Sequence, residues 1–274
     1  MEAPRGCDLL TREADGDPAE RLRTLEWEVV GPAAFGAHVH MAMDEVLLDR
    51  VIVGERRPTM RIWEWIEPAL VIGSHQSVRN EIDLAEADRL GFTVTRRMSG
   101  GGTMLCEPAR TITYSMYLPE SAVAGISFRK SYALLDDWAV RAFAALGVPA
   151  SYREINDIIS PRGKIAGAAQ ARRRGHVVHH TTIAHAMDPD LVPRLIRVGR
   201  ERISPQGVRS ADKSVSPLSW FTAASCADVA RELRLFFART YDARAGELSD
   251  EELTAARDLA ASKYSTAAWV DRLP

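Results

Sequence analysis

The chain has 274 residues, of which 46% are hydrophobic and 26% charged, and its 35 Lys and Arg against 37 Asp and Glu give a formal net charge of −2. This composition is typical of a globular protein, and it excludes a global electrostatic attraction to nucleic acid or to an anionic membrane. No stretch approaches the ~20 apolar residues of a membrane-spanning helix. The three cysteines, Cys7, Cys106 and Cys226, are too scattered for a disulfide framework or a CxxC metal site, so reduced thiols and a cytoplasmic location are expected.

The first residues are polar and acidic and lack an apolar core segment, which predicts a flexible leader over residues 1–24 rather than a secretory signal. A strand is expected over 25–30. Apolar residues with helical spacing predict a helix over 36–53, with Asp44 and Glu45 on its polar face. Further strands are expected at 59–65, 69–73, 92–96, 111–118, 156–159 and 177–186, helices at 83–90 and 127–146, and mainly helical chain from 189 apart from a loop at 204–219.

The predicted strands come in pairs and hairpin-like runs and do not alternate strictly with helices. This order favours an α+β fold in which a mixed, mostly antiparallel sheet is covered by helices. No linker-like stretch divides the sequence, so residues 25–274 are predicted to form one domain with a helical C-terminal tail.

The first candidate site is the segment RRMSGGG, which follows the strand predicted at 92–96. Three consecutive glycines, Gly100–Gly102, let the backbone approach an anion closely and direct its N–H groups toward it. Arg96 and Arg97 can bind phosphate or carboxylate through two parallel hydrogen bonds. No GK[ST] follows, so the loop is not a Walker A motif. The alternative interpretation is a flexible turn.

The second candidate site is the segment GKIAGAAQ, in which Lys164 lies among small residues that leave room for a ligand. A lysine there can bridge a carboxylate and a phosphate as a point charge. Just upstream, Asn156 and Asp157 could supply an amide and a carboxylate to a nucleotide or a metal ion. The alternatives are a solvated lysine in a turn and an ordinary Asx turn.

Cys106 and two neighbouring histidines are the remaining candidates. Cys106 could be a nucleophile for thioester chemistry, which requires a base and a lowered pKa, and a buried structural cysteine is the alternative. His179 and His180 are adjacent on a predicted strand and point to opposite faces, so they do not chelate a metal together. Either histidine could line a pocket or be a hydrogen-bonded core residue.

From about Leu25, the two motifs in this order and the terminal segment KYSTAAW resemble the lipoate–protein ligase family of the biotin/lipoate ligase superfamily. The resemblance implies a biotin/lipoate ligase-like catalytic domain and a two-step reaction. Lipoate and ATP, with Mg²⁺, give lipoyl-AMP, and the lipoyl group then passes to a lysine of a lipoyl-acceptor protein. Neither nucleic acid nor a membrane is an expected partner.

The resemblance also implies roles for individual residues. Lys164 is the expected catalytic residue, in contact with the acyl carboxylate and the phosphate. Asp157 is in addition a candidate metal ligand. The residues expected to bind lipoate or nucleotide are Arg96, Arg97, Ser99, Gly100, Gly101, Gly102, Thr103, Met104, Leu105, His75, Asn156, Asp157, Gly167, Ala169 and His180. The sequence departs from the family where a His-Asp pair is Cys106-Glu107 and where the glycine of His-His-Gly is Thr181.

Octanoyl- and lipoyltransferases of this fold use a cysteine thioester and no ATP, and in those that resemble this chain the cysteine precedes the Gly-Lys segment. Residues 150–163 contain no cysteine and include Asn156-Asp157, as in the ligases. The main prediction is therefore an ATP-dependent lipoate–protein ligase, and the alternative is an acyltransferase that forms its thioester on Cys106. A non-catalytic member and a biotin-type ligase are further alternatives. The sequence ends soon after KYSTAAW, so either a separate small protein supplies the accessory domain that many ligases carry, or the chain acts unaided.

Overall fold

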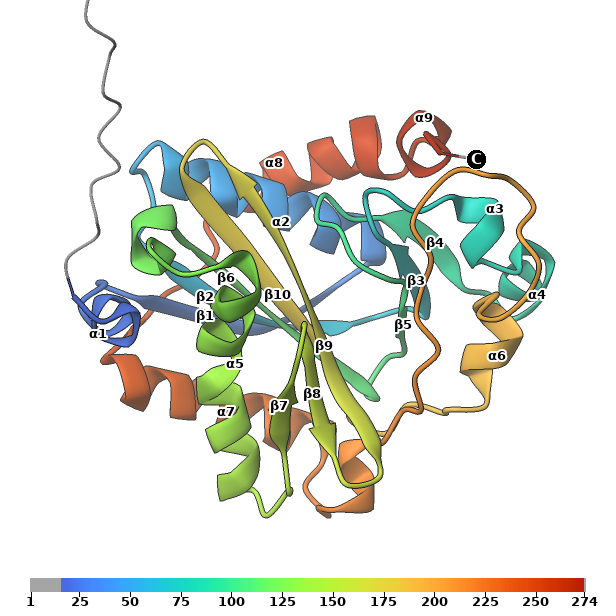
Figure 1. Ribbon diagram of the computed structural model, residues 1–274. Coiled ribbons are helices and arrows are strands. Elements are labelled where there is room, and N and C mark those ends of the chain that lie inside the picture. The colour runs from blue at the N-terminus through green and yellow to red at the C-terminus, as the bar shows by residue number, and fades with distance from the viewer. Residues whose placement is uncertain (1–15, 274) are drawn as a thin grey trace, which may run out of the picture.

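The computed structural model describes residues 16–273, and its centre is an eight-stranded sheet in the order β11-β1-β2-β6-β10-β9-β8-β7 (Figure 1). The strands are β1 (Glu28–Phe35), β2 (Thr59–Trp65), β6 (Thr111–Pro119), β7 (Ser151–Arg153), β8 (Asp157–Ser160), β9 (Gly163–Arg173), β10 (His176–Ala184) and β11 (Arg244–Ala245). Within this sheet, only the pairings of β1 with β2 and with β11 are parallel. The predicted α+β fold with a mixed, mostly antiparallel sheet is confirmed.

A second sheet of three strands, in the order β4-β3-β5, holds the glycine-rich segment. Its strands are β3 (Ala69–Ile72), β4 (Thr93–Arg96) and β5 (Met104–Cys106). Because β4 and β5 both pair with β3, the segment 97–103 that connects them is fixed at both ends by one buried strand.

Helices cover both faces of the large sheet. α2 (Ala37–Ile52) and α8 (Asp250–Leu259) lie along one face, and α5 (Phe128–Ala145) and α7 (Cys226–Tyr241) along the other (Figure 1). Side chains alternate accordingly along β2, where Met60 and Ile62 pack with the α5/α7 cluster while Trp63 and Trp65 pack with α2. The remaining elements are α1 (Pro18–Arg23), α3 (Val78–Glu81), α4 (Leu84–Arg89), α6 (Leu191–Leu195), α9 (Ala267–Val270), the 3₁₀ helices η1 (Glu120–Val123) and η2 (Leu218–Trp220), and the π-helical turn η3 (Ala260–Tyr264).

Most predicted elements have counterparts within a few residues, but three expectations are wrong. The leader predicted over 1–24 extends too far, because α1 packs Leu22 into the core with 1% of its surface exposed; residues 1–15 lie outside the described chain. The strands predicted at 156–159 and 177–186 leave out β9, which lies between them and contains Lys164. Of the chain predicted to be mainly helical from 189, residues 196–203 form no helix, whereas the loop predicted at 204–219 contains only η2 at its end. Across residues 16–273, no helix is both long and apolar enough to cross a membrane.

Candidate functional site

A cavity of about 470 Å³ lies where the two sheets meet. Its wall is formed by residues 101–103 of the glycine loop (residues 99–103), by β9 and β10, by the first turns of α5 and by the segment 208–215. Leu105, Met187 and Ile196, which belong to the apolar cluster around the small sheet, form an apolar part of the wall. The cavity therefore combines an apolar surface with the two motifs that the sequence singled out.

Lys164 of β9 lines the cavity with its cationic side chain. Its Nζ lies 2.9 Å from Oδ1 of Asp157, whose Oδ2 is bound by the Lys213 amine. Desolvation lowers the pKa of Lys164, Asp157 opposes this shift, and the charge of Lys213 adds to it. The Lys164 side chain keeps 28% of its surface exposed, so its amine is accessible from the cavity.

A β-bulge at residue 165 directs this lysine. Ile158 pairs with Ala166 and Ile159 with Lys164, so Ile165 is an extra residue in β9. Because side chains alternate along a strand, the extra residue turns Lys164 onto the face that carries Gly167. A Cβ atom at Gly167 would lie only 2.3 Å from Lys164 Nζ, so the absence of a side chain there creates the space for the amine.

Arg97 shapes the glycine loop from within. The side chain is buried, and it donates to Ser99 Oγ at 3.0 Å, to the Val71 carbonyl at 2.9 Å and to the Gly102 carbonyl at 2.7 Å, with further bonds to Gly100. No carboxylate among the described residues pairs with it, and burial lowers its pKa to about 10, so it remains charged at neutral pH. Arg97 reaches the cavity wall, but its donors hold the loop instead of forming the expected free fork for a ligand.

Arg96 was also expected to bind substrate, but it lies outside the cavity wall and donates to backbone carbonyls. Its guanidinium donates to the carbonyls of Gly73 at 2.9 Å, Gln76 at 2.7 Å and Val270 at 2.7 Å, which ties α9 to the small sheet. His75 does not line the cavity; its carbonyl accepts the Val208 N–H at 2.8 Å and so holds the cavity segment 208–215. Both residues support the wall from outside.

The other predicted site residues divide into two groups. Those in the wall are Gly101, Gly102, Thr103, Met104, Leu105, Asn156, Gly167 and Ala169. Ser99, Gly100 and His180 lie outside the wall, with Ser99 and His180 buried behind the loop. The side-chain amide of Asn156 donates to the Ala168 carbonyl at 2.6 Å. Both oxygens of Asp157 are paired with lysines, and residues 16–273 contain no cluster of three or more His, Cys, Asp or Glu suited to a metal ion.

Neither of the two described cysteines, Cys106 and Cys226, lines the cavity. Cys106 on β5 is fully buried in the α2 cluster, outside the cavity wall, and desolvation raises the pKa of its thiol well above the usual range. Cys226 begins α7, and burial raises its pKa to about 12. Cys7 lies outside the described residues. Within the described chain, no cysteine faces the cavity.

The segment 208–215 lies within the loop predicted at 204–219 and forms part of the cavity wall. Ser210 Oγ accepts the Thr103 N–H at 2.9 Å, and the Ser214 carbonyl accepts the Lys164 N–H at 2.8 Å, so the segment joins both motifs. It also supplies Lys213. The available signal was Arg209 and Lys213 in a stretch without apolar periodicity, next to glycine and serine.

Solved structures share this fold. The bi-partite lipoate protein ligase of Thermoplasma acidophilum is 22% identical, with a TM-score of 0.75 over 91% of this chain and 98% of its own. A lipoate-protein ligase A bound with ATP is 21% identical, with a TM-score of 0.74 over 91% of this chain and all of its own. At these identities the likeness establishes the fold alone.

Sequence relatives correct the expected activity. Octanoyltransferase LipM of Geobacillus kaustophilus is 29% identical over 268 residues, 87% of this chain and 94% of its own. Octanoyltransferase LipM of Kyrpidia tusciae is 27% identical over 271 residues, 89% of this chain and 97% of its own. Their name denotes octanoyl transfer, so the predicted ATP-dependent lipoate–protein ligase is wrong and the transferase alternative is favoured. Residues 36–238 match the model of the lipoyl protein ligase A/B catalytic domain, and the chain belongs to that family.

Proposed function

We propose that this protein is an acyltransferase that moves an octanoyl group from a thioester donor to a lysine of a lipoyl-acceptor protein, without ATP. The observation that carries the proposal is the cavity, in which Lys164 and the glycine loop meet an apolar wall. A medium-chain acyl group packs against Leu105, Met187 and Ile196, while its carbonyl lies near Lys164. Relatives named as octanoyltransferases over nearly their whole length support this substrate class.

The reaction requires positive charge or hydrogen-bond donors around the carbonyl oxygen of the thioester. The neutral amine of the acceptor lysine attacks the thioester carbonyl carbon, the C–N bond forms and the C–S bond breaks. The leaving thiolate takes up the proton that the amine loses. Negative charge develops on the carbonyl oxygen in between, where the Lys164 ammonium and loop N–H groups stabilise it. Asp157 favours the charged form of Lys164 against desolvation.

The transfer we propose is direct and forms no acyl-enzyme on Cys106. That thiol is buried outside the cavity wall, and its raised pKa disfavours the thiolate that thioester formation needs. Of the predicted acyltransferase with a thioester on Cys106, we therefore keep the octanoyl transfer. The nucleophile that we propose is the acceptor lysine in place of Cys106.

The acceptor is proposed to dock over the cavity mouth. Three apolar side chains of the wall are exposed there, Phe128 by 47%, Ile155 by 44% and Val208 by 58%. Beside Phe128, Arg129 and Lys130 are exposed and form no ion pair within residues 16–273. Positive charge in the first turn of a helix is unfavourable, so an acidic partner surface would relieve this arrangement.

The decisive experiment combines the purified protein with an octanoyl thioester of a carrier protein and a lipoyl domain, in the absence of ATP. Mass spectrometry should find a hydroxylamine-resistant octanoyl amide on the acceptor lysine. Lys164→Ala should reduce the transfer rate about 10²–10³-fold, because a charge that acts in the transition state is removed. A variant in which Cys7, Cys106 and Cys226 are alanine should retain activity.

Two results would contradict the proposal. Absence of ATP-independent transfer by the folded wild-type protein would exclude octanoyl transfer. Loss of transfer in the folded cysteine-free variant, together with a hydroxylamine-sensitive adduct on wild-type protein, would exclude the direct route and leave the transferase activity standing.

A further inference from the structure

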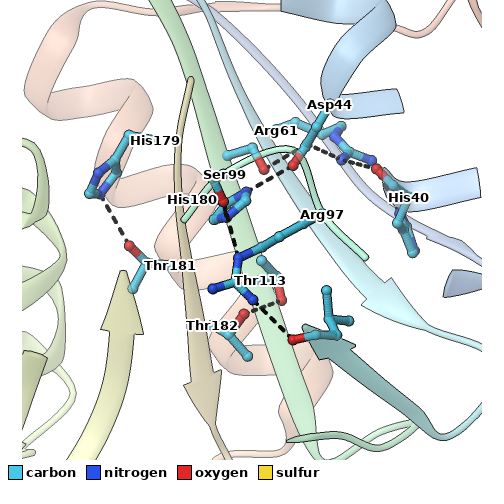
Figure 2. A network of polar contacts seen from close by, with 12 residues as sticks. His40, Asp44, Arg61, Arg97, Ser99, Thr113, His179, His180, Thr181 and Thr182 are labelled. Atoms are coloured by element: carbon cyan, nitrogen blue, oxygen red, sulfur yellow. Dashed lines mark hydrogen bonds and ion pairs between the residues drawn. The ribbon is translucent and has the colours of Figure 1, made fainter. Parts of the chain in front are cut away.

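A chain of three buried side chains connects α2 to the glycine loop (Figure 2). His180 Nδ1 lies 2.9 Å from Asp44 Oδ2, and His180 Nε2 lies 2.7 Å from Ser99 Oγ. The other Asp44 oxygen accepts from Arg61 at 2.7 Å and from Tyr117 at 2.6 Å. Asp44 was expected on the polar face of its helix, and these partners from β2, β6 and β10 explain why it is buried instead.

The protonation states along this chain follow from its chemistry. Burial opposes ionisation of Asp44, but the hydrogen bond from His180 and the charge of Arg61 outweigh it and lower the pKa of the carboxyl. A carboxylate only accepts hydrogen bonds, so His180 Nδ1 donates. Burial lowers the pKa of His180, so Nε2 is unprotonated and accepts the Ser99 hydroxyl proton. The Ser99 oxygen is then free to accept from Arg97 Nε at 3.0 Å.

The contacts have the Ser-His-Asp order of a hydrolase triad, yet Ser99 cannot serve as a nucleophile. Ser99 is fully buried and lies outside the cavity wall, and besides His180 its hydroxyl contacts Arg97, which donates to it. We propose that Asp44, His180 and Ser99 are positioning residues that fix the Arg97 guanidinium and, through it, the conformation of the glycine loop.

The effect on the loop follows from peptide geometry. Arg97 binds the carbonyls of Gly100 and Gly102. Because C=O and N–H point in opposite directions in a trans peptide, the Gly101 N–H is directed away from Arg97. Three successive glycines have high conformational freedom, so a fixed Arg97 reduces the states available to the loop. A misplacement of about 1 Å in such a site can cost roughly 10² in rate.

The neighbouring histidine provides a matched control. His179 is also fully buried on β10, and its Nε2 lies 2.6 Å from Asp136 Oδ1. It points to the opposite face, where Gln170 and Thr181 are its other partners, and it contacts no residue of the glycine loop (Figure 2). Substitution of either histidine removes a comparable buried hydrogen-bond pair, but only His180 is connected to Arg97.

The test compares His180→Leu, His180→Gln and His179→Leu in the full chain. Hydrogen–deuterium exchange of peptides covering 98–105 should accelerate about tenfold in His180→Leu and remain unchanged in His179→Leu. In octanoyl transfer, a readout that rests on the proposed function, kcat should fall about 10²-fold in His180→Leu, with KM within about threefold. His180→Gln should recover part of this loss, because an amide can donate to Asp44 and accept from Ser99.

Equal exchange at 98–105 in the two leucine variants would overturn the proposal, as would an acyl adduct on Ser99. If the wild-type protein has no transferase activity, the proposed function fails while the exchange experiment still decides the positioning role. If the wild type is active and both leucine variants lose the same activity, the positioning role fails alone.

Discussion

Replacement of Gly167 by alanine should disable Lys164 without unfolding the protein. The new Cβ atom would lie 2.3 Å from Lys164 Nζ and 2.7 Å from Cε. Ordinary carbon contacts are about 3.5–4.0 Å, so the amine must move by more than about 1 Å. That movement takes it from the position 2.9 Å from Asp157 in which it faces the cavity.

The expected magnitudes separate activity from stability. Gly167 lies in β9 without a positive φ, so alanine fits the backbone, and removal of glycine from the unfolded chain favours folding by roughly 0.4–1 kcal/mol. The displaced atom is the end of a flexible side chain, which can move at low cost. A catalytic group displaced by about 1 Å costs about 10² in rate, or about 2.7 kcal/mol of transition-state stabilisation.

A double-mutant cycle makes this prediction specific. The transfer rate and the urea midpoint are measured for Gly167→Ala, Lys164→Ala and the double variant. Gly167→Ala should lose most activity in the wild-type background and change little when Lys164 is already alanine. Full activity of Gly167→Ala, or a further large loss in the Lys164→Ala background, would refute the role assigned to this glycine.

Three further perturbations have defined outcomes. Lys213→Ala removes a positive charge that lowers the pKa of Lys164, so the alkaline limb of the kcat/KM profile should move to higher pH; an unchanged limb contradicts the coupling. Phe128→Asp with Lys130→Glu should raise KM for an acidic acceptor at least about fivefold at low salt while kcat changes by less than about threefold, and equal KM values would exclude docking at this mouth. The lowered pKa of Asp44 contributes stability that is present above the unfolded carboxyl pKa of about 3.9 and is lost as pH falls through the folded value. The free energy of unfolding of Asp44→Asn, measured with urea from pH 5 to pH 2, should therefore be lower than that of the wild type and depend less on pH. An unchanged slope against pH would contradict this assignment.

Local sequence patterns predicted the elements that frame the site. The strand predicted at 59–65 matches β2, and the helix predicted at 36–53 differs from α2 by one residue at each end. These patterns depend on alternation and periodicity, which a single segment carries by itself. The glycine loop and the lysine motif were identified for the same reason, since both are continuous in sequence.

The roles of the charged residues required contacts between distant segments. Arg96 and Arg97 look like anion ligands as long as their donors are unassigned, but folding directs those donors to the carbonyls of Gly73, Val71 and Gly102. The orientation of Lys164 depends on a bulge that only strand register reveals. No local pattern contains this information.

The missing cysteine explains both the wrong prediction of a ligase and the route that we propose. The family resemblance implies a cysteine in the segment before the Gly-Lys motif of the acyltransferases, whereas residues 150–163 of this chain contain no cysteine and include Asp157. The structure pairs Asp157 with Lys164 and Lys213. The carboxylate of Asp157 favours the protonated form of Lys164. It lies in the segment where, by the resemblance, a cysteine thiol would carry the acyl group. A carboxylate tied to two lysines is a poor nucleophile, whereas the lysine that it holds is a good stabiliser of the oxyanion. Loss of the covalent step is therefore compatible with transfer only if the thioester and the acceptor lysine occupy the site together, which requires that the acceptor bind before the donor thiol leaves.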